Sequence, residues 1–441
     1  MKLANKKKQN KEKFYKMNLD ERLIYLQEKT NLSANDIALL RNPSSLTFGN
    51  ANRMIENAIG VLSLPLGIAT NFVINNKKYV VPMAIEEPSV IAAASKAAKI
   101  ANVNGGFKAE CREALMIGQV QLVSLPVSLA TARRRISAHK SEILRIANSK
   151  STSIKAKNLQ IKDVVDTSPL KMGKMLVLEL LVDTKDAMGA NTINTMCESV
   201  SSRIEELTGG RAILRILSNY ATRRMVKCRA IFSKSDIGGI DVVENILYAY
   251  SFAYSDVYRA VTHNKGIMNG IDAVALATGQ DFRAIEAAAH AYAARDGKYR
   301  SLSNWYKTRT GDLAGELELP LAVGIVGGSA SVHPTAMVGL KILGVKTAKE
   351  LATILCAVGL AQNMAALRAL AAEGIQSGHM KLHAKNIAIM AGAQNSEIDI
   401  VAQKIYDENN VTPTRAKEIL FSVRHKGRSQ YRLYRASKDA N

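Results

Sequence analysis

The stretch MLVLELLVDTKDAMGANTINTMCESVSSRIEEL, residues 175–207, changes its hydrophobic period half-way along and thereby decides the fold class. The run Met175–Asp183 is almost continuously apolar, which is typical of a buried strand. After a turn of small and polar residues, apolar side chains recur at helical spacing, which predicts a helix over Gly189–Leu207. A strand that leads into an amphipathic helix indicates an α+β domain.

The mixed texture extends over residues 113–218. Further strand-like runs occupy Gly118–Val127 and Val164–Asp166, and a helix is expected over Ser128–Asn148. Two helices interleaved with several strands predict a small α+β sandwich inserted into a larger, mainly helical unit. For that unit we expect helices within 18–60, a hairpin at 71–82 with an Asn-Asn-Lys-Lys turn, a helix whose first position is Pro88, a strand plus loop at 317–334, and a helix at 413–423.

The charge is strongly positive but unevenly distributed. The chain has 441 residues, with 60 Lys and Arg against 38 Asp and Glu, a net charge of +22. About half of this surplus lies in residues 1–16 and 424–441, which we expect to be solvated basic tails. A content of 47% hydrophobic residues excludes a disordered protein. A nucleic-acid or anionic-surface binder that acts through the basic termini remains the alternative class.

The compartment follows from cysteine usage and apolar run length. Four scattered cysteines without a CxxC motif are typical of a reduced, cytoplasmic protein. The charged N-terminus is not followed by an apolar segment, so no signal peptide is expected. The longest apolar stretches, such as Ala58–Ala69, are shorter than the roughly 20 residues that a membrane span needs. We therefore expect no membrane span.

Common catalytic signatures do not occur. The chain has no GxGxxG after a strand, no GxxxxGK[ST] and no GxSxG, so an ordinary Rossmann site is not expected. His379 and His383 stand four residues apart, a spacing that can bind zinc on one helix face. No third ligand is evident nearby, and we expect no metal site.

Two segments have an unusual composition at expected helix starts. In VPMAIEEPSV (81–90), two adjacent carboxylates either cap the helix dipole or include a general acid whose pKa is tuned by burial. In DAMGANTINTMCE (186–198), Asp186 is either the N-cap of the helix or part of a site. The small residues after it would let a pyrophosphate approach the backbone N–H groups.

Two further segments admit both a structural and a functional interpretation. The segment 357–388 begins with an Ala-rich helix that is expected to end at Gly374 or Gly378. His383 follows it and is either a structural histidine or a site residue. The segment 258–281 is either a polar surface or a pocket, since buried polar groups need partners. It gathers Arg259, His263, Asn264, Lys265, Asn269 and Asp281 among glycines and apolar residues.

Taken together, these segments resemble class II hydroxymethylglutaryl-CoA reductases, the soluble bacterial and archaeal type. The resemblance covers about residues 18–423, and both basic ends lie outside it. Its most specific parts are the EEPS, DAMGAN and HNKG blocks. The blocks that carry it, in the family's order, are ENAIG, LPLGIATNF, VPMAIEEPSVIAAAS, DAMGANTINT, RILSN, THNKGIMNGID, AHAYAARDGKY, AVGLAQN and EGIQSGHMKLHAKNIA.

The resemblance implies an oxidoreductase that interconverts 3-hydroxy-3-methylglutaryl-CoA with mevalonate and CoA through two hydride transfers with NAD(P)H. It assigns Glu87 as the catalytic acid and Lys265 as the group that stabilises the oxyanion. Asp281 would complete a coupled triad with these two residues. His383 would protonate the departing CoA thiolate, delivered by a mobile C-terminal flap.

The resemblance also implies the binding residues and the assembly. Ser89 and Arg259 would bind the hydroxymethylglutaryl group, with Asn219 and Asn269 as polar partners. Active sites of the family lie at a dimer interface, so a homodimer or a multiple of it is expected. The dinucleotide site would be a non-Rossmann site on the inserted domain, with Asp186, Met188, Gly189, Ala190, Asn191 and Ser151.

The loop SKSTSIKAKN (149–158) bears on the choice of cofactor. Relatives that prefer NADH would carry an acidic residue here, whereas this chain offers Ser151 among three lysines. An acid-free loop is compatible with a 2′-phosphate, so the expectation leans towards NADPH use or dual specificity. Gln280 and Lys385 stand where Asn and Arg are commoner, and both changes are mild.

The expected fold is therefore α+β, with a large mainly helical domain around a central sheet and helix core and an inserted small ferredoxin-like dinucleotide-binding domain. The expected segments are a basic tail at 1–16, the large domain at 17–112 and 219–376, the small domain at 113–218, a flap at 377–423 and a basic tail at 424–441.

Overall fold

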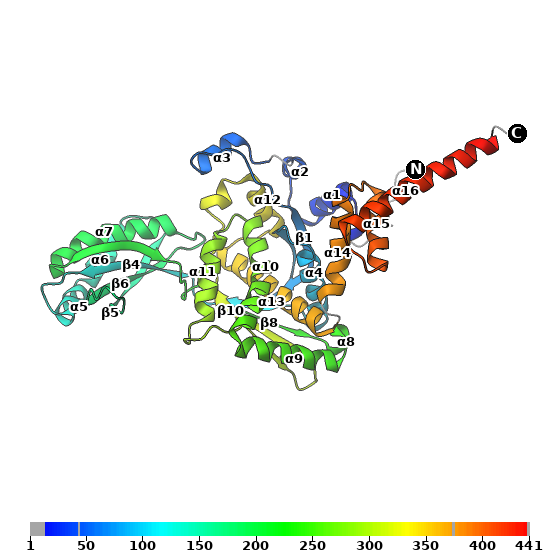
Figure 1. Ribbon diagram of the computed structural model, residues 1–441. Helices are drawn as coiled ribbons and strands as arrows, with labels where there is room; N and C mark the ends of the chain where they lie inside the picture. The colour runs from blue at the N-terminus through cyan, green and yellow to red at the C-terminus, as the bar shows by residue number, and fades with distance from the viewer. Residues whose placement is uncertain (1–13, 43–44, 373–374, 439–441) are drawn as a thin grey trace. The chain divides into compact units, whose positions relative to one another are not determined.

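The computed structural model describes residues 14–42, 45–372 and 375–438 (Figure 1). The chain divides into two compact units, residues 1–366 and 367–441, and each is described by itself. The α+β class expected from the sequence is confirmed, because both antiparallel sheets and long helices occur in the first unit.

The N-terminal helices pack on a later helix of the same unit. Asn18 and Ser33 each close a capping box, which fixes where the first two helices begin. The buried carboxylate of Asp36 accepts a hydrogen bond from Lys341 at 2.7 Å, and this bond lowers its pKa to about 2. The elements are η1 (Phe14–Lys16), α1 (Leu19–Lys29), α2 (Ala34–Arg41), α3 (Phe48–Met54) and, after the central sheet, α12 (Pro334–Leu343).

A hairpin leads from these helices to the first candidate site segment. Strands β1 (Leu66–Ile74) and β2 (Lys77–Ala84) pair antiparallel. The turn consists of Asn75 and Asn76 alone, at φ of 50° and 66°, the geometry that asparagine tolerates in a type I′ turn. The expected four-residue turn is therefore wrong by two residues, since both lysines belong to β2.

A four-stranded antiparallel sheet, in the order β3-β8-β10-β9, forms the centre of the first unit. Phe232 on this sheet contacts the rings of Phe107 and Trp305, which joins the sheet to the segment before it. The strands are β3 (Lys108–Cys111), β8 (Met225–Phe232), β9 (Ser303–Lys307) and β10 (Leu313–Pro320). The helical segments of this region are α4 (Val90–Ala101), η2 (Asn102–Asn104), α8 (Lys234–Ile237), α9 (Ile240–Ser255), α10 (Val257–Ala277), α11 (Phe282–Ala293), η3 (Gly328–Ser331) and α13 (Ala348–Ala372).

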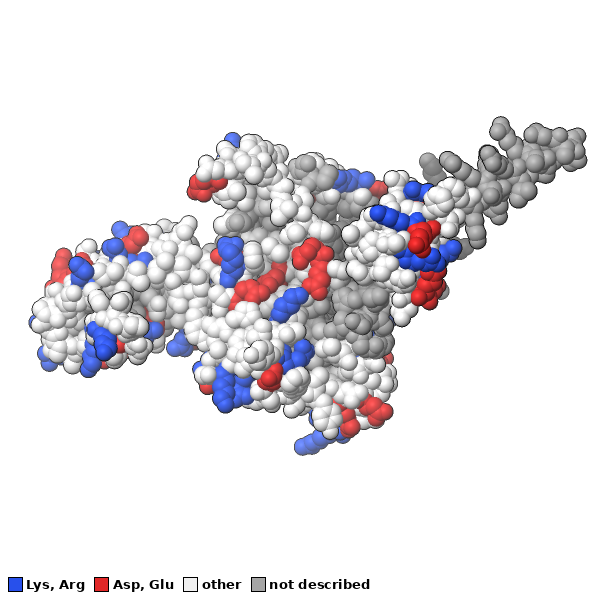
Figure 2. Space-filling model, in the orientation of Figure 1, with Lys and Arg blue, Asp and Glu red and all other residues white. Residues whose placement is uncertain are grey.

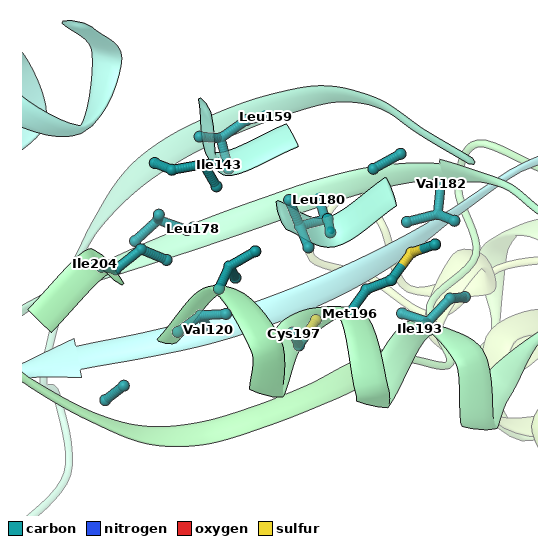
Figure 3. Close-up of a cluster of buried hydrophobic side chains, with 14 of the residues drawn as sticks. Val120, Ile143, Leu159, Leu178, Leu180, Val182, Ile193, Met196, Cys197 and Ile204 are labelled. Atoms are coloured by element: carbon teal, nitrogen blue, oxygen red, sulfur yellow. The ribbon is translucent and has the colours of Figure 1, made fainter. Parts of the chain in front are cut away.

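The inserted segment folds around a second four-stranded antiparallel sheet, in the order β5-β6-β4-β7. With helices after its first and third strands, it has the βαββαβ sequence of a ferredoxin-like unit. Side chains from α6, α7 and three strands meet in one buried cluster (Figure 3). The elements are β4 (Leu115–Val123), α5 (Leu129–Ala138), α6 (Lys140–Asn148), β5 (Lys155–Val165), β6 (Lys174–Asp183), α7 (Ala190–Thr208) and β7 (Arg211–Ser218).

Helix α13 is long and apolar enough to span a bilayer by length and composition alone. Within the structure, 67% of its most apolar window is buried. Packing in a protein core therefore accounts for its composition, and one such helix is weak support for a membrane span.

The second unit is a small group of three helices with its own core. Val401, Ile405 and Leu420 are buried in it, and Arg424 binds Glu397 at 2.8 Å across two of the helices. The helices are α14 (Ile375–Met390), α15 (Ser396–Asp407) and α16 (Pro413–Lys438).

Several expected boundaries were wrong. Helix α4 begins at Val90, so Pro88 precedes it and does not occupy its first position. The helix expected over Ser128–Asn148 is divided at His139. Gly378 lies inside α14 and does not end a helix. The basic segment from residue 424 continues α16 as far as Lys438, whereas the basic residues 1–13 lie outside the described part of the chain.

Candidate active site

The loop between β2 and α4 brings a carboxylate against helix α10. Glu87 Oε2 accepts a hydrogen bond from Lys265 Nζ at 2.9 Å and a second from Asn269 Nδ2 at 3.3 Å. Lys265 and Asn269 stand one turn apart on α10 and therefore share a face. The adjacent Glu86 is exposed, so Glu87 is the carboxylate of the pair that meets the helix.

The opposite face of α10 explains how the lysine is held in place. His263 Nε2 lies 2.8 Å from Ser303 Oγ and 3.1 Å from Asn363 Nδ2, and burial lowers the pKa of His263 to about 3. Asn264 binds the backbone at Arg300 and Leu302. The polar cluster of this segment therefore splits into buried neutral residues that anchor the helix and a lysine that faces the carboxylate.

Two expected substrate residues have side chains without partners. Ser89 adopts a φ of +74°, a left-handed conformation that costs a serine free energy and often marks a functional site. Its hydroxyl makes no hydrogen bond to any residue that the structure describes. Arg259 is half-buried, and burial lowers the pKa of its guanidinium. No carboxylate within the described ranges pairs with it, so this cation suits an anionic ligand.

Asp281 has local partners in the structure. Its carboxylate caps α11 through Ala284 N at 3.2 Å and pairs with Arg283 at 3.0 Å. Within the described residues of a single chain, it makes no hydrogen bond to Lys265 or Glu87, so the expected coupled triad does not form there. Its catalytic role stays a prediction.

The turn before α7 has the geometry of an anion-binding helix start. Gly189 adopts a φ of +84°, and a Cβ added there would lie 2.5 Å from Thr184 Cγ2, so only glycine fits. The first N–H groups of the 19-residue helix, from Ala190 and Asn191 onwards, have no partner within the helix. A helix N-terminus with such a close backbone approach suits a pyrophosphate.

Asp186 does not cap α7, as one interpretation of the sequence expected. Its Oδ1 accepts a hydrogen bond from Ala348 N at 2.8 Å at the start of α13, and its carbonyl accepts from Ile325 N at 2.8 Å. Asp186 therefore ties the turn to the large sheet-and-helix region. Met188, next to Gly189, packs partly buried against the core of the inserted segment.

Comparison with known proteins decides the family. The family model described as hydroxymethylglutaryl-coenzyme A reductase matches residues 18–384. The chain is 50% identical over 415 residues to the 3-hydroxy-3-methylglutaryl-coenzyme A reductase of Archaeoglobus fulgidus, which covers 93% of this chain and 94% of that one. The chain belongs to the hydroxymethylglutaryl-coenzyme A reductase family.

Other relatives of this reductase family give the class. A probable 3-hydroxy-3-methylglutaryl-coenzyme A reductase of Borreliella burgdorferi is 38% identical over 77% of this chain and 80% of its own length. A class II reductase of Streptococcus pneumoniae, solved with NADPH in open conformations, matches 92% of this chain and 100% of its own with a TM-score of 0.77 and 39% identity. The class II assignment expected from the sequence is confirmed, and the comparisons support no nucleic-acid-binding alternative.

In the loop that bears on cofactor choice in this reductase, some side chains are bonded within the protein and others are exposed. Ser151 Oγ accepts from Ile154 N at 3.1 Å, and Lys155 Nζ donates to the carbonyls of Asn148 and Ser151. Lys155 is thus engaged at the end of α6. Lys150 and Lys157 are exposed and form no ion pair with any described residue.

The remaining expected site residues lie at the surface. Asn219 is exposed directly after β7. His383 is exposed on α14 in the second unit, where Lys385 binds Asp399 at 2.6 Å. The side chain of His379 lies outside what the structure describes, and the described residues contain no group of three His, Cys, Asp or Glu side chains that could hold a metal.

A half-buried acid pair between α10 and α11 was missed by the sequence analysis. Asp272 follows Asn269 on α10 by one turn, and its pKa is raised to about 9 by burial and by its hydrogen bond with Glu286. Glu286 binds His290 Nε2 at 2.6 Å, and His290 Nδ1 lies 2.7 Å from Tyr299 Oη. The only local signal was the four-residue spacing of Glu286 and His290 on one helix.

Proposed function

We propose that this chain interconverts 3-hydroxy-3-methylglutaryl-CoA with mevalonate and CoA in two successive hydride transfers with NAD(P)H. The observation that carries the proposal is the contact of Glu87 with Lys265, since the family resemblance assigns these two residues to the reacting carbonyl; Asn269, a polar partner in the same site, binds the same carboxylate. An ammonium group beside a carboxylate can stabilise a developing alkoxide and exchange a proton with it.

The substrate residues are those that the resemblance assigns, and the surroundings of Arg259 and Ser89 support the assignment. The half-buried guanidinium of Arg259 would bind the free carboxylate of the hydroxymethylglutaryl group, and the unpartnered hydroxyl of Ser89 would position it. Asn269 would hold Glu87 while Lys265 moves to the substrate oxygen. Asn219 is a further polar partner. Asp281 would titrate together with Glu87 and Lys265 and so help to set which of them carries a proton.

The dinucleotide site fits the turn before α7. The N–H groups of Ala190 and Asn191 would hold the pyrophosphate, Gly189 leaves room for it, and Asp186 and Met188 fix the turn. When bound, the nicotinamide supplies the hydride to the thioester carbon. His383, on the C-terminal flap, would protonate the CoA thiolate. No metal enters the mechanism.

We propose that the enzyme uses NADPH or has dual specificity for NADPH and NADH. Lys150 and Lys157 are exposed and would meet a 2′-phosphate, and Ser151 stands where an acidic residue would repel it, while Lys157 also attracts the carboxylate of Asp183. A relative of the same class has been solved with NADPH.

We propose a cytoplasmic homodimer, or a multiple of it, in which two chains complete each active site. Apolar side chains lie unusually exposed in the segment before β1, where Ile59 is 100% and Leu62 is 91% exposed. Tyr258, beside Arg259, is 87% exposed. A second chain over these surfaces would also bring Asp281 of one chain towards Lys265 and Glu87 of the other, a contact that does not form among the described residues of a single chain.

The test of the proposal is reduction of NAD(P)+ that depends on both mevalonate and CoA, together with the reverse reaction. Lys265→Ala should lower kcat by about 10³-fold or more, because it removes the oxyanion stabiliser. Lys307→Ala is the matched control, since Lys307 also pairs with a glutamate, Glu244 at 3.1 Å, outside the site. Wild-type protein that turns over neither nicotinamide cofactor in either direction would refute the function.

A further inference from the structure

An arginine outside every assigned site lies between the cofactor turn and the central region. Arg224, directly before β8, is only 2% exposed. No carboxylate of the described residues lies within ion-pair distance, and burial lowers the pKa of its guanidinium. Burying a cation without an ion-pair partner is costly, and the cost is offset here by hydrogen bonds and by the longer-range attraction of Asp183 and Asp186.

The side-chain hydrogen bonds of Arg224 connect two chain segments. Its Nη1 donates to Thr184 Oγ1 at 3.3 Å and to the carbonyl of Ala187 at 3.2 Å. Its Nη2 donates to the carbonyl of Val323 at 2.8 Å. Because the guanidinium is planar and rigid, it fixes the distance between the turn Thr184–Met188 and the segment after β10.

The two segments also touch without the arginine. A Cβ added to Gly324 would lie 2.7 Å from Met188 N, and the carbonyl of Asp186 accepts from Ile325 N at 2.8 Å. Gly324 N in turn donates to Gln280 Oε1 at 2.8 Å. Gln280 immediately precedes Asp281, so a continuous set of contacts runs from the cofactor turn to the residue assigned as the catalytic aspartate.

We propose that Arg224 is a positioning residue that holds the dinucleotide-binding turn in a fixed place relative to the segment carrying Asp281. This inference rests on the proposed function, because it concerns how the nicotinamide is aligned with the acid groups. The side chain of Arg224 is buried and bonds to protein groups, and it would act by fixing the carbonyl of Ala187, two residues before Gly189.

The test replaces Arg224 by lysine, which keeps the charge but cannot donate to three acceptors in the same plane. Arg224→Lys should raise the KM for NAD(P)H by about tenfold and lower kcat by a similar factor, with the KM for hydroxymethylglutaryl-CoA changed by less than about twofold. Arg223→Lys is the control, because Arg223 is a neighbouring arginine with a long, partly exposed contact of 4.0 Å to Glu113. It should behave as the wild type.

A purely structural role makes a different prediction. It would lower the melting temperature and the yield of active enzyme while leaving both KM values unchanged, and this result would overturn the proposal. Should Arg224→Lys not fold, Thr184→Val decides, since it removes one acceptor while the arginine stays. Thr184→Val should raise the cofactor KM selectively, by about threefold, and unchanged constants would refute the inference. If the wild type itself is inactive, the proposed function fails instead.

Discussion

A single carboxylate oxygen of Glu87, Oε2, accepts hydrogen bonds from both Lys265 and Asn269. In the EEPS block two carboxylates stand side by side, and residue type alone gives no reason to prefer either. The family resemblance selected Glu87, and the structure separates the two by their surroundings. In contrast, nothing local could indicate that His263 and Asn264 anchor α10, because their partners Ser303, Asn363 and Arg300 are distant in sequence.

The proposed cofactor preference can also be tested at single residues. If Lys150 and Lys157 bind a 2′-phosphate, replacing both by glutamate should raise the KM for NADPH by about tenfold, because each exposed ion pair contributes up to about 1 kcal/mol. The KM for NADH should change by less than about twofold. Lys171→Glu, in the exposed loop between β5 and β6, is the control for charge alone. Equal effects on both cofactors would exclude the 2′-phosphate contact.

At the scale of elements, α10 and α11 share the acid pair Asp272 and Glu286. Burial and the bond to Glu286 raise the pKa of Asp272 to about 9, above its unfolded value, while the bond to His290 lowers the pKa of Glu286. The folded protein thus holds a proton on Asp272 that the unfolded chain releases above about pH 4. Stability from this group is full below the unfolded pKa and declines as the pH rises towards 9.

Asp272→Asn tests this directly, because the amide keeps a donor towards Glu286 and cannot ionise. The free energy of unfolding of the variant should fall less between pH 5 and pH 9 than that of the wild type. Urea titrations at both pH values measure the difference. Identical pH slopes for the two proteins would contradict a protonated Asp272.

Several elements were out of reach of the sequence for physical reasons. Strand β5 begins at Lys155, but its lysine-rich first half lacks a clear alternation, so only its end near Val164 was expected. The break at His139 depends on packing of α5 and α6 against α7, which is a tertiary effect. The start of β6 and the bounds of α7 were close to the expected ones, because a buried strand and an amphipathic helix have strong periods.

At the scale of the whole molecule, the surface combines mixed charges with exposed apolar side chains. On the face seen in Figure 2, acidic and basic side chains of the described residues are interspersed. The exposed apolar side chains of Ile59 and Leu62 support the proposed contact with a second chain more strongly than the mixed charges do. Composition alone could not show them, because hydrophobic content does not reveal which side chains remain at the surface of one chain.

The proposed dimer leads to a prediction at this scale. Light scattering should give a mass of at least two chains, and Leu62→Glu should shift the protein towards monomers and lower activity by about tenfold or more, because it places a charge in a desolvated interface. Leu170→Glu, at another exposed leucine in the loop between β5 and β6, should change neither. A monomeric wild type with full activity would refute the shared site.

The hydrogen bonds of Asp186 and Arg224 limit how far this enzyme can be treated as modular. Residues 113–218 look like a cassette that could be exchanged to import another cofactor preference. Yet Asp186 caps α13, and Arg224 lies beyond the cassette while it holds the turn inside it. A chimera cut at these borders would combine the turn of one protein with the Arg224 region of another, so the hydrogen bonds that hold the turn would be lost. Grafts that also carry residues 219–224 and 321–325 should retain activity where the shorter ones lose it.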